Sequence, residues 1–185
     1  MLYSTIETQT LPTTLAEFMG WDAPIDGYKY EWNDGEIEKS EKMKKKHLKL
    51  IYALASLFDG TKAKKQKGLL IPEQDVMLTG IQLRRPDLAY FSGVQIENSD
   101  KTDDEPIPAF VIEIISPTDD AVKVEAKIAE YFKAGVEVLW HIYPENQAVY
   151  VYTSRKTVKI CTDDDICSAN PTLPDFEISA NQLFA

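Results

Sequence analysis

Long apolar runs and cysteines are scarce in this 185-residue chain, and each scarcity excludes a class of protein. No apolar run approaches the roughly 18–20 residues needed to cross a bilayer, so we expect no membrane partner. The start of the chain lacks the basic and apolar regions of a secretory signal peptide. The two cysteines, Cys161 and Cys167, form no CxxC pair of the kind that binds zinc, and we interpret them as ordinary thiols. Together these features predict a cytoplasmic protein.

The chain has the length and composition of one folded domain. Domains typically contain roughly 100–200 residues, and 44% of these residues are hydrophobic, enough for a sizeable core. The sequence contains no internal repeat, no low-complexity tract and no linker long enough to divide it. We therefore expect residues 1–185 to form a single domain, with residues 1–12 as a loose N-terminal arm.

Negative charge dominates the sequence, but positive charge is concentrated in one stretch. The net charge of −10 argues against a nucleic-acid partner, because phosphate binding favours positive charge. Residues 39–67, however, hold ten lysines and two acids, which gives this stretch a charge of +8. It is either a solvated helix face or a surface that follows a phosphate backbone. Its candidates for nucleic-acid binding are Lys44, Lys45, Lys46 and His47.

Local patterns predict a mixture of helices and strands. Asn33-Asp34-Gly35 predicts a tight hairpin, because Asp and Gly both tolerate positive φ. Apolar spacings of three, four and seven predict a helix over residues 41–58. A further helix is expected from Ser116 to about Ala134, and a surface loop over residues 93–108. The remaining predicted strands are residues 69–78, 87–91, 109–115, 137–143, 147–153 and 157–161.

Glu113 is the most informative residue, because it lies inside an almost continuously apolar run. Residues 109–115, bounded by Pro108 and Pro117, are typical of a strand buried on both faces. A carboxylate there is costly unless a cation, hydrogen bonds or a metal ion compensates it. Asp87 opens another short strand, and if the two strands are neighbours, their carboxylates converge. Such a pair is either a Mg²⁺ site or a pair of salt-bridged acids.

Other polar residues are candidates for supporting roles. Lys123 and Lys127 share one face of the helix after the buried strand, since they lie four residues apart. A lysine near a metal-bound water can orient that water and stabilise charge on a phosphate, although most helix lysines are simply solvated. Glu31 and Glu36 flank the hairpin as further acids. We expect His141 to be a satisfied core residue rather than a base.

The order of these residues resembles the PD-(D/E)XK nuclease superfamily. Pro86-Asp87 is followed by Glu113 and then by a helix with Lys127 and Tyr131. More narrowly, the chain resembles a large bacterial family of restriction-endonuclease-like proteins that is expanded in cyanobacteria. The similarity covers about residues 13–185, through the segments YEWNDGEI, RRPDLAYF, VIEIISPTDDAVKVEAKIAEYFKAGVEVLWHIYPENQAVYVY and LPDFEI.

The resemblance implies a fold, an activity and a cofactor. The fold is α/β (α+β) and restriction-endonuclease-like, with an αβββαβ core and a mixed central sheet flanked by helices. The activity is Mg²⁺-dependent hydrolysis of DNA phosphodiester bonds, with Mn²⁺ as a substitute. By the same resemblance, Asp87 and Glu113 hold the metal, a backbone carbonyl just after Glu113 adds a ligand, and Glu31 contributes as a further acid.

The sequence departs from the superfamily pattern at one position. The superfamily lysine usually lies two residues after the acid, where this chain has Ile115. The resemblance transfers the lysine's role to Lys127 on the next helix. Because of this departure, a catalytically inactive nucleic-acid-binding or regulatory module on the same fold is the alternative, and an interaction protein without a nucleic-acid role is a third. Many nucleases of this fold are dimers, so a homodimer stays open.

Overall fold

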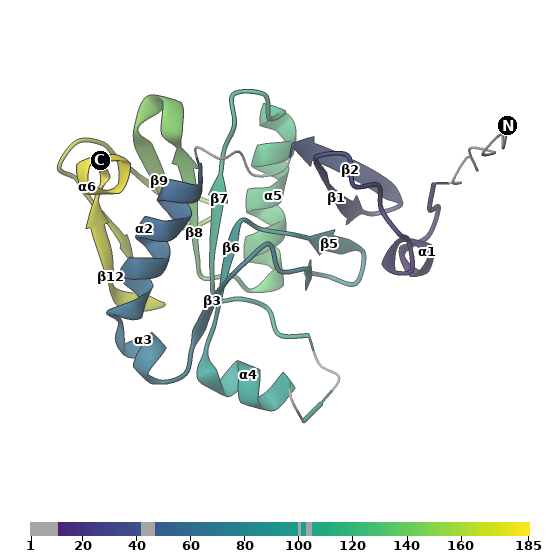
Figure 1. The fold of residues 1–185 in the computed structure, drawn as a ribbon, viewed down its shortest axis with the longest axis horizontal. Coiled ribbons are helices and arrows are strands. Elements are labelled where there is room, and N and C mark those ends of the chain that lie inside the picture. Colours follow the sequence, from purple (N-terminus) through teal and green to yellow (C-terminus); the bar gives the residue numbers. More distant parts are fainter. Residues whose placement is uncertain (1–10, 42–46, 100, 103–104) are drawn as a thin grey trace, which may run out of the picture.

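The computed structural model describes residues 11–41, 47–99, 101–102 and 105–185, and Figure 1 shows their arrangement. The helices in these residues are α1 (Leu15–Met19), α2 (Leu48–Asp59), α3 (Lys62–Lys65), α4 (Gly93–Ser99), α5 (Ala121–Ala134) and α6 (Ala180–Phe184), with a 3-10 turn at Pro144–Asn146. None of these helices is long and apolar enough to cross a membrane.

The strands form three sheets. The largest has the order β10-β9-β8-β7-β6-β3, a four-stranded sheet has the order β2-β1-β5-β4, and β11 pairs with β12. The strands are β1 (Tyr28–Asn33), β2 (Glu36–Glu41), β3 (Leu69–Pro72), β4 (Val76–Met77), β5 (Gln82–Arg84), β6 (Leu88–Phe91), β7 (Phe110–Ile114), β8 (Val138–Tyr143), β9 (Ala148–Ser154), β10 (Thr157–Cys161), β11 (Ile166–Ala169) and β12 (Leu173–Ser179).

The largest sheet confirms the predicted fold class. Its strands β7 and β8 are parallel, whereas its other neighbouring strands are antiparallel, so the sheet is mixed. Helix α5 makes the crossover between the parallel pair. Taken in chain order, α2, β3, β6, β7, α5 and β8 give the expected αβββαβ core. The segment that contains β4 and β5 is an insertion in this core, and both strands belong to the four-stranded sheet.

Alternate residues of β7 face different helices, because successive side chains of a strand point to opposite faces. Phe110 packs in the same core cluster as Leu54 of α2. Val111 packs in a second cluster with Ile128 of α5. Figure 1 shows α2 and α5 on either side of this strand. Glu113 follows Val111 by two residues, so its side chain faces α5.

The β1–β2 hairpin places a second sheet beside α5. Its turn is the predicted one, since Asp34 and Gly35 both adopt positive φ, 45° and 94°. A small apolar cluster that includes Phe18 of α1 and Trp32 of β1 supports this hairpin. The hairpin carries Glu31 on its buried side, next to the central sheet.

Several predicted element boundaries are wrong. The helix predicted from residue 41 begins at Leu48, because Glu41 ends β2 and pairs with Tyr28. Residues 42–46, which include Lys44, Lys45 and Lys46, lie outside the described residues. The helix after β7 begins at Ala121 rather than Ser116, because the Asp120 side chain accepts hydrogen bonds from the backbone N–H groups of Val122 and Lys123.

Two other segments also differ from prediction. Residues 69–78 form two strands, β3 and β4, and Glu73 between them has a positive φ of 49°. Gly93–Ser99 forms helix α4 where a loop was expected. Cys161 and Cys167 are buried, free thiols, as predicted.

Candidate active site

An acidic cavity of about 510 Å³ lies where β1 and β2 meet β7 and α5. Lysines contribute four of its described lining residues and acids contribute seven. The lysines are Lys29, Lys39, Lys123 and Lys127, and the acids are Glu31, Glu38, Glu41, Asp87, Glu113, Asp119 and Asp120. Negative charge therefore exceeds positive charge around the cavity, which favours the binding of cations.

Asp87 and Glu113 lie side by side in this cavity, as the sequence predicted for neighbouring strands. In the antiparallel pairing of β6 and β7, Leu88 lies opposite Ile112, and the same register sets Asp87 opposite Glu113. The backbone N–H of Ile114 donates a hydrogen bond to Asp87 Oδ2 at 2.7 Å. Both acids are buried, with exposures of 8% and 5%.

Helix α5 fixes the Glu113 carboxylate from the other side. The hydroxyl of Tyr131 donates a hydrogen bond to Glu113 Oε1 at 2.6 Å, and Lys127 Nζ lies 3.7 Å from the same oxygen. Burial and the nearby carboxylates Glu113 and Glu31 raise the pKa of Tyr131 well above its usual value, so the hydroxyl remains a donor. Lys127 and Tyr131 are four residues apart, which places both on the helix face that meets β7.

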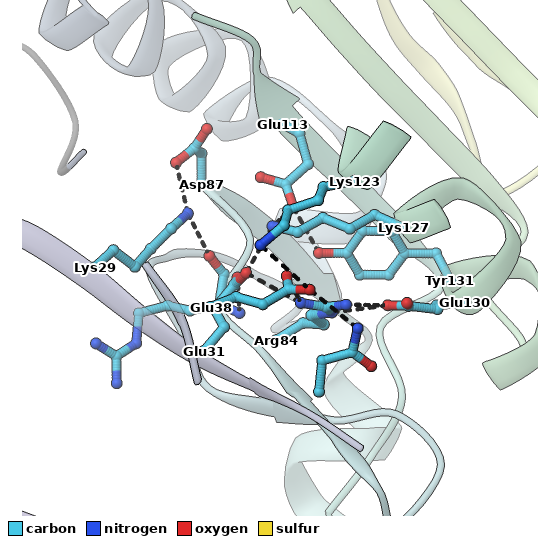
Figure 2. Close-up of polar contacts among 12 residues, drawn as sticks. Lys29, Glu31, Glu38, Arg84, Asp87, Glu113, Lys123, Lys127, Glu130 and Tyr131 are labelled. Carbon is cyan, nitrogen blue, oxygen red and sulfur yellow. Dashed lines mark hydrogen bonds and ion pairs between the residues drawn. The ribbon is translucent and has the colours of Figure 1, made fainter. Parts of the chain in front are cut away.

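Glu31, on the hairpin, lies in one cluster of charged side chains with Asp87, Glu113 and Lys127. Its Oε2 lies 2.7 Å from Lys127 Nζ, and its Oε1 accepts a hydrogen bond from the Arg85 backbone N–H at 2.8 Å. Burial opposes ionisation of Glu31, but Lys127, Lys29 and Arg84 outweigh it and lower the pKa of Glu31 to about 2. Glu31 is therefore a charged partner that fixes Lys127. Figure 2 shows this arrangement.

Lys29 is a member of the cluster that sequence reasoning missed. Its Nζ lies 3.5 Å from Asp87 Oδ1 and donates a hydrogen bond to the Arg85 carbonyl at 2.8 Å. Burial lowers the pKa of Lys29, but Glu113, Asp87 and Glu31 raise it above its usual value overall. Strand alternation could have identified Lys29, because it precedes Glu31 by two residues and therefore lies on the same face of the strand.

The charges of this cluster do not balance. Three carboxylates, on Glu31, Asp87 and Glu113, face the two ammonium groups of Lys29 and Lys127. The guanidinium of Arg84 also lies near Glu31, but it is shared with two further carboxylates, those of Glu38 and Glu130. Burial and Glu113 raise the pKa of Asp87, whereas Lys29, the Ile114 N–H and Lys127 lower it; the net result is about 6. Asp87 is thus the member of the cluster that holds a proton in mild acid.

Arg84 connects the hairpin to α5 behind the cluster. Its guanidinium, only 1% exposed, lies 2.6 Å from Glu38 on β2 and 2.7 Å from Glu130 on α5. Glu31 lies 3.5 Å away as a third carboxylate. No role was predicted for Arg84 from the sequence, because its three partners are distant from it along the chain. In Figure 2 this guanidinium lies among the carboxylates of the three glutamates.

His141 lines the cavity from β8, where it pairs with Glu113 across the parallel strands. Its side chain is buried, as predicted, but the prediction that it is satisfied is wrong. Neither ring nitrogen has a hydrogen-bond partner within the part of the chain that the structure describes. Burial lowers the pKa of His141 to about 4, with opposing contributions from Glu113, which raises it, and Lys127, which lowers it. The imidazole is therefore neutral at physiological pH.

The residues predicted to bind nucleic acid are only partly described. His47 is buried at the cavity wall. Lys44, Lys45 and Lys46 fall outside the described residues. The later lysines of the stretch, from Lys62 onward, lie in and after α3, beyond the twelve residues of α2. Twelve helical residues span roughly 18 Å, so the lysine-rich stretch is not one surface at the cavity.

Asp87 and Glu113 have the chemistry of ligands for a hard divalent cation. Within the described ranges, no group of three His, Cys, Asp or Glu side chains is arranged to hold a metal ion. Mg²⁺ needs no such group, because it commonly binds one or two carboxylates and keeps water and substrate oxygens as its other ligands. Two buried carboxylates in a cluster with excess negative charge fit that requirement.

Comparisons with known proteins place the chain in a family. The Uma2 family model, described as "Putative restriction endonuclease", matches residues 15–181. A crystal structure titled as that of "a putative nuclease belonging to DUF820" from Anabaena variabilis has a TM-score of 0.80. It is 23% identical, and the match covers 94% of this chain and 98% of that chain. No curated protein matches the chain. The chain belongs to the Uma2 family of restriction-endonuclease-like proteins.

Proposed function

We propose that the protein is a metal-dependent endonuclease that hydrolyses DNA phosphodiester bonds. The observation that carries this proposal is the buried pair of Asp87 and Glu113, with Lys127 Nζ 3.7 Å from Glu113. Two carboxylates can hold a divalent cation, and an ammonium group beside them can stabilise negative charge on a phosphate. Membership of the Uma2 family supports the reaction class.

Asp87 and Glu113 would hold Mg²⁺, or Mn²⁺ in its place. A bound divalent cation supplies two effects here, a lowered pKa for water and compensation of charge on the phosphate. The protein's own groups fix the two ligands in advance. The Ile114 N–H holds Asp87 and the Tyr131 hydroxyl holds Glu113, so their carboxylates need little reorganisation.

Lys127 is the proposed replacement for the missing superfamily lysine. Its position on α5 lets the ammonium group reach the Glu113 side of the cavity. There it can orient a water molecule and stabilise negative charge that develops on the phosphate. Glu31 holds this ammonium group at 2.7 Å and so limits its motion. We assign Glu31 this positioning role rather than that of a third metal ligand.

DNA is the proposed substrate, and the acidic cavity gives a reason for a cation requirement. Acids outnumber lysines among the described lining residues, so a phosphate is repelled until a divalent cation offsets the charge. We propose Lys44, Lys45, Lys46 and His47 as the group that contacts the DNA backbone. Of these, His47 lines the cavity.

The test is cleavage of supercoiled plasmid and of single- and double-stranded oligonucleotides in millimolar Mg²⁺ or Mn²⁺. Glu113→Gln keeps the shape of the side chain and removes its charge, so we expect at least about a 100-fold loss of rate, equivalent to roughly 3 kcal/mol. Glu125→Gln, an exposed change on α5, is the matched control and should cleave normally. Circular dichroism verifies that both variants fold.

Two results would contradict the proposal. Equal cleavage by Glu113→Gln and the unaltered protein would exclude Glu113 from the reaction. Salt-dependent DNA binding without cleavage of any substrate, and without change in Asp87→Ala, would instead support an inactive binding module on the same fold.

A further inference from the structure

We propose that Lys29 is an internal cation that occupies Asp87 in the metal-free protein, competes with the metal ion, and contacts the substrate phosphate once the metal is bound. This inference rests on the proposed function. It adds a second lysine to the active site, beside the proposed set of Asp87, Glu113 and Lys127.

Lys29 and Asp87 form a buried pair rather than a surface ion pair. Their side chains are 9% and 11% exposed, and Nζ lies 3.5 Å from Oδ1. The Arg85 carbonyl accepts a hydrogen bond from the same Nζ at 2.8 Å, which anchors the ammonium group beside the carboxylate. Buried charges interact more strongly than exposed ones, because little water screens them.

The two lysines of the cluster have different partners. Lys127 lies closest to Glu31, at 2.7 Å, and next to Glu113. Lys29 pairs with Asp87, and Figure 2 shows this pair on the side of the cluster opposite to Lys127. A divalent ion bound to Asp87 and Glu113 would therefore be close to the Lys29 ammonium group. Like charges a few ångströms apart repel, so Lys29 weakens metal binding.

Binding of the metal also changes what Lys29 can do. Once Asp87 ligates a divalent ion, the carboxylate offers less negative charge to the ammonium group. Lys29 lines the cavity, and a phosphate there is the anion that best replaces the lost partner. Ile115 stands at the usual lysine position of the superfamily. Lys29 and Lys127 together would then supply positive charge on two sides of the phosphate.

The test separates metal affinity from catalysis. Calorimetric titration of the full chain with Mg²⁺ at pH 8, without DNA, measures affinity for the unaltered protein, Lys29→Gln and Lys29→Met. We expect at least about a tenfold rise in affinity when the charge is removed. In saturating Mg²⁺, the same variants should lose at least about tenfold in cleavage rate. Lys29→Arg, which retains the charge, should keep metal affinity near that of the unaltered protein.

Lys39→Met is the matched control, because it removes the same charge from the neighbouring strand β2. Lys39 is 45% exposed and pairs with Asp26 at 3.0 Å, so solvent screens it and affinity should change by less than about threefold. Lys29→Gln retains a donor for the Arg85 carbonyl and carries the test if Lys29→Met unfolds.

The outcomes distinguish this inference from the function on which it rests. Unchanged or weaker Mg²⁺ binding by folded Lys29→Gln would overturn the competing role of Lys29 and leave the nuclease proposal intact. Tighter binding with undiminished cleavage would overturn its contact with phosphate. Failure of the unaltered protein to bind Mg²⁺ at all would overturn both proposals.

Discussion

Replacement of Arg84 by methionine should destabilise the protein far more than replacement of its neighbour Arg85. Arg84 is 1% exposed and interacts with Glu31, Glu38 and Glu130, which belong to three different elements. Removal of one partner from a buried charge network typically costs about 3–5 kcal/mol, because the remaining charges stay buried and uncompensated. Whole domains are stable by only about 5–15 kcal/mol, so this loss is a large fraction.

Arg85 provides the comparison within the same dipeptide. Its side chain is 32% exposed and pairs with Asp75 at 2.6 Å, and Asp75 is itself 42% exposed. Exposed ion pairs contribute only about 0–1 kcal/mol, so Arg85→Met should have a small effect. The two substitutions remove the same side chain from adjacent positions, and only the environment differs.

Urea unfolding at pH 7, followed by far-ultraviolet circular dichroism, measures both effects. With a slope of about 2 kcal/mol per molar urea, Arg84→Met should shift the midpoint by roughly 2 M and Arg85→Met by less than roughly 0.5 M. Equal shifts for the two variants would show that the buried network does not hold the hairpin against α5. Removal of Glu130 together with Arg84 should cost less than the two single losses combined, because they share one interaction.

Three further substitutions test single groups of the cluster. Glu31→Gln should cost about 2–4 kcal/mol at pH 7 in urea unfolding. Because the pKa of Glu31 is lowered to about 2, its stabilisation is complete above about pH 4.5 and is lost toward pH 2, so the difference should narrow in that window. His141→Leu should stabilise the protein by about 1–2 kcal/mol at pH 7, since it removes two unpaired buried nitrogens. The lowered pKa of His141 also predicts that, from about pH 6.5 toward pH 4, the unaltered protein loses stability relative to this variant. Tyr131→Phe should cost about 1–3 kcal/mol and weaken Mg²⁺ binding in calorimetry, whereas unchanged affinity would show that the hydroxyl does not position Glu113.

The parts of the fold that sequence predicted best are those with strong local signals. Residues around Glu113 are apolar without alternation, because both faces of β7 are covered, and the short length of the run between two prolines favours a buried strand. Asp34-Gly35 fixes the hairpin turn through its backbone conformation. Gly135 ends α5 with a φ of 110°, which glycine adopts most easily.

The errors have local physical causes as well. Ser116-Pro117 has the composition of a helix start, but Asp120 supplies the cap of α5 instead. The helix predicted over residues 41–58 included Glu41, which instead pairs with Tyr28 in the hairpin. Sequence patterns at these positions suit two structures, and long-range pairing decides between them.

Some residues of the candidate site were likewise predicted from the sequence, and others were missed. Asp87, Glu113, Lys127 and Glu31 were named from their order and their resemblance to a family, and the structure brings all four together. Lys29 and the Arg84 network were missed, because their partners are distant in sequence and only the docking of the hairpin unites them. The unpaired nitrogens of His141 were missed because burial alone does not reveal whether a polar group has partners.

The central claim is that Asp87 and Glu113 bind a divalent metal ion, and crystals grown with millimolar Mn²⁺ test it most directly. We expect an anomalous peak at about 2.1 Å from a carboxylate oxygen of each residue, the distance that suits small divalent ions. In Glu113→Gln crystals that peak should be lost or much weaker. A fully occupied Mn²⁺ elsewhere on the protein, with the Asp87–Glu113 cavity open to solvent and empty, would show that these two residues are not the metal ligands.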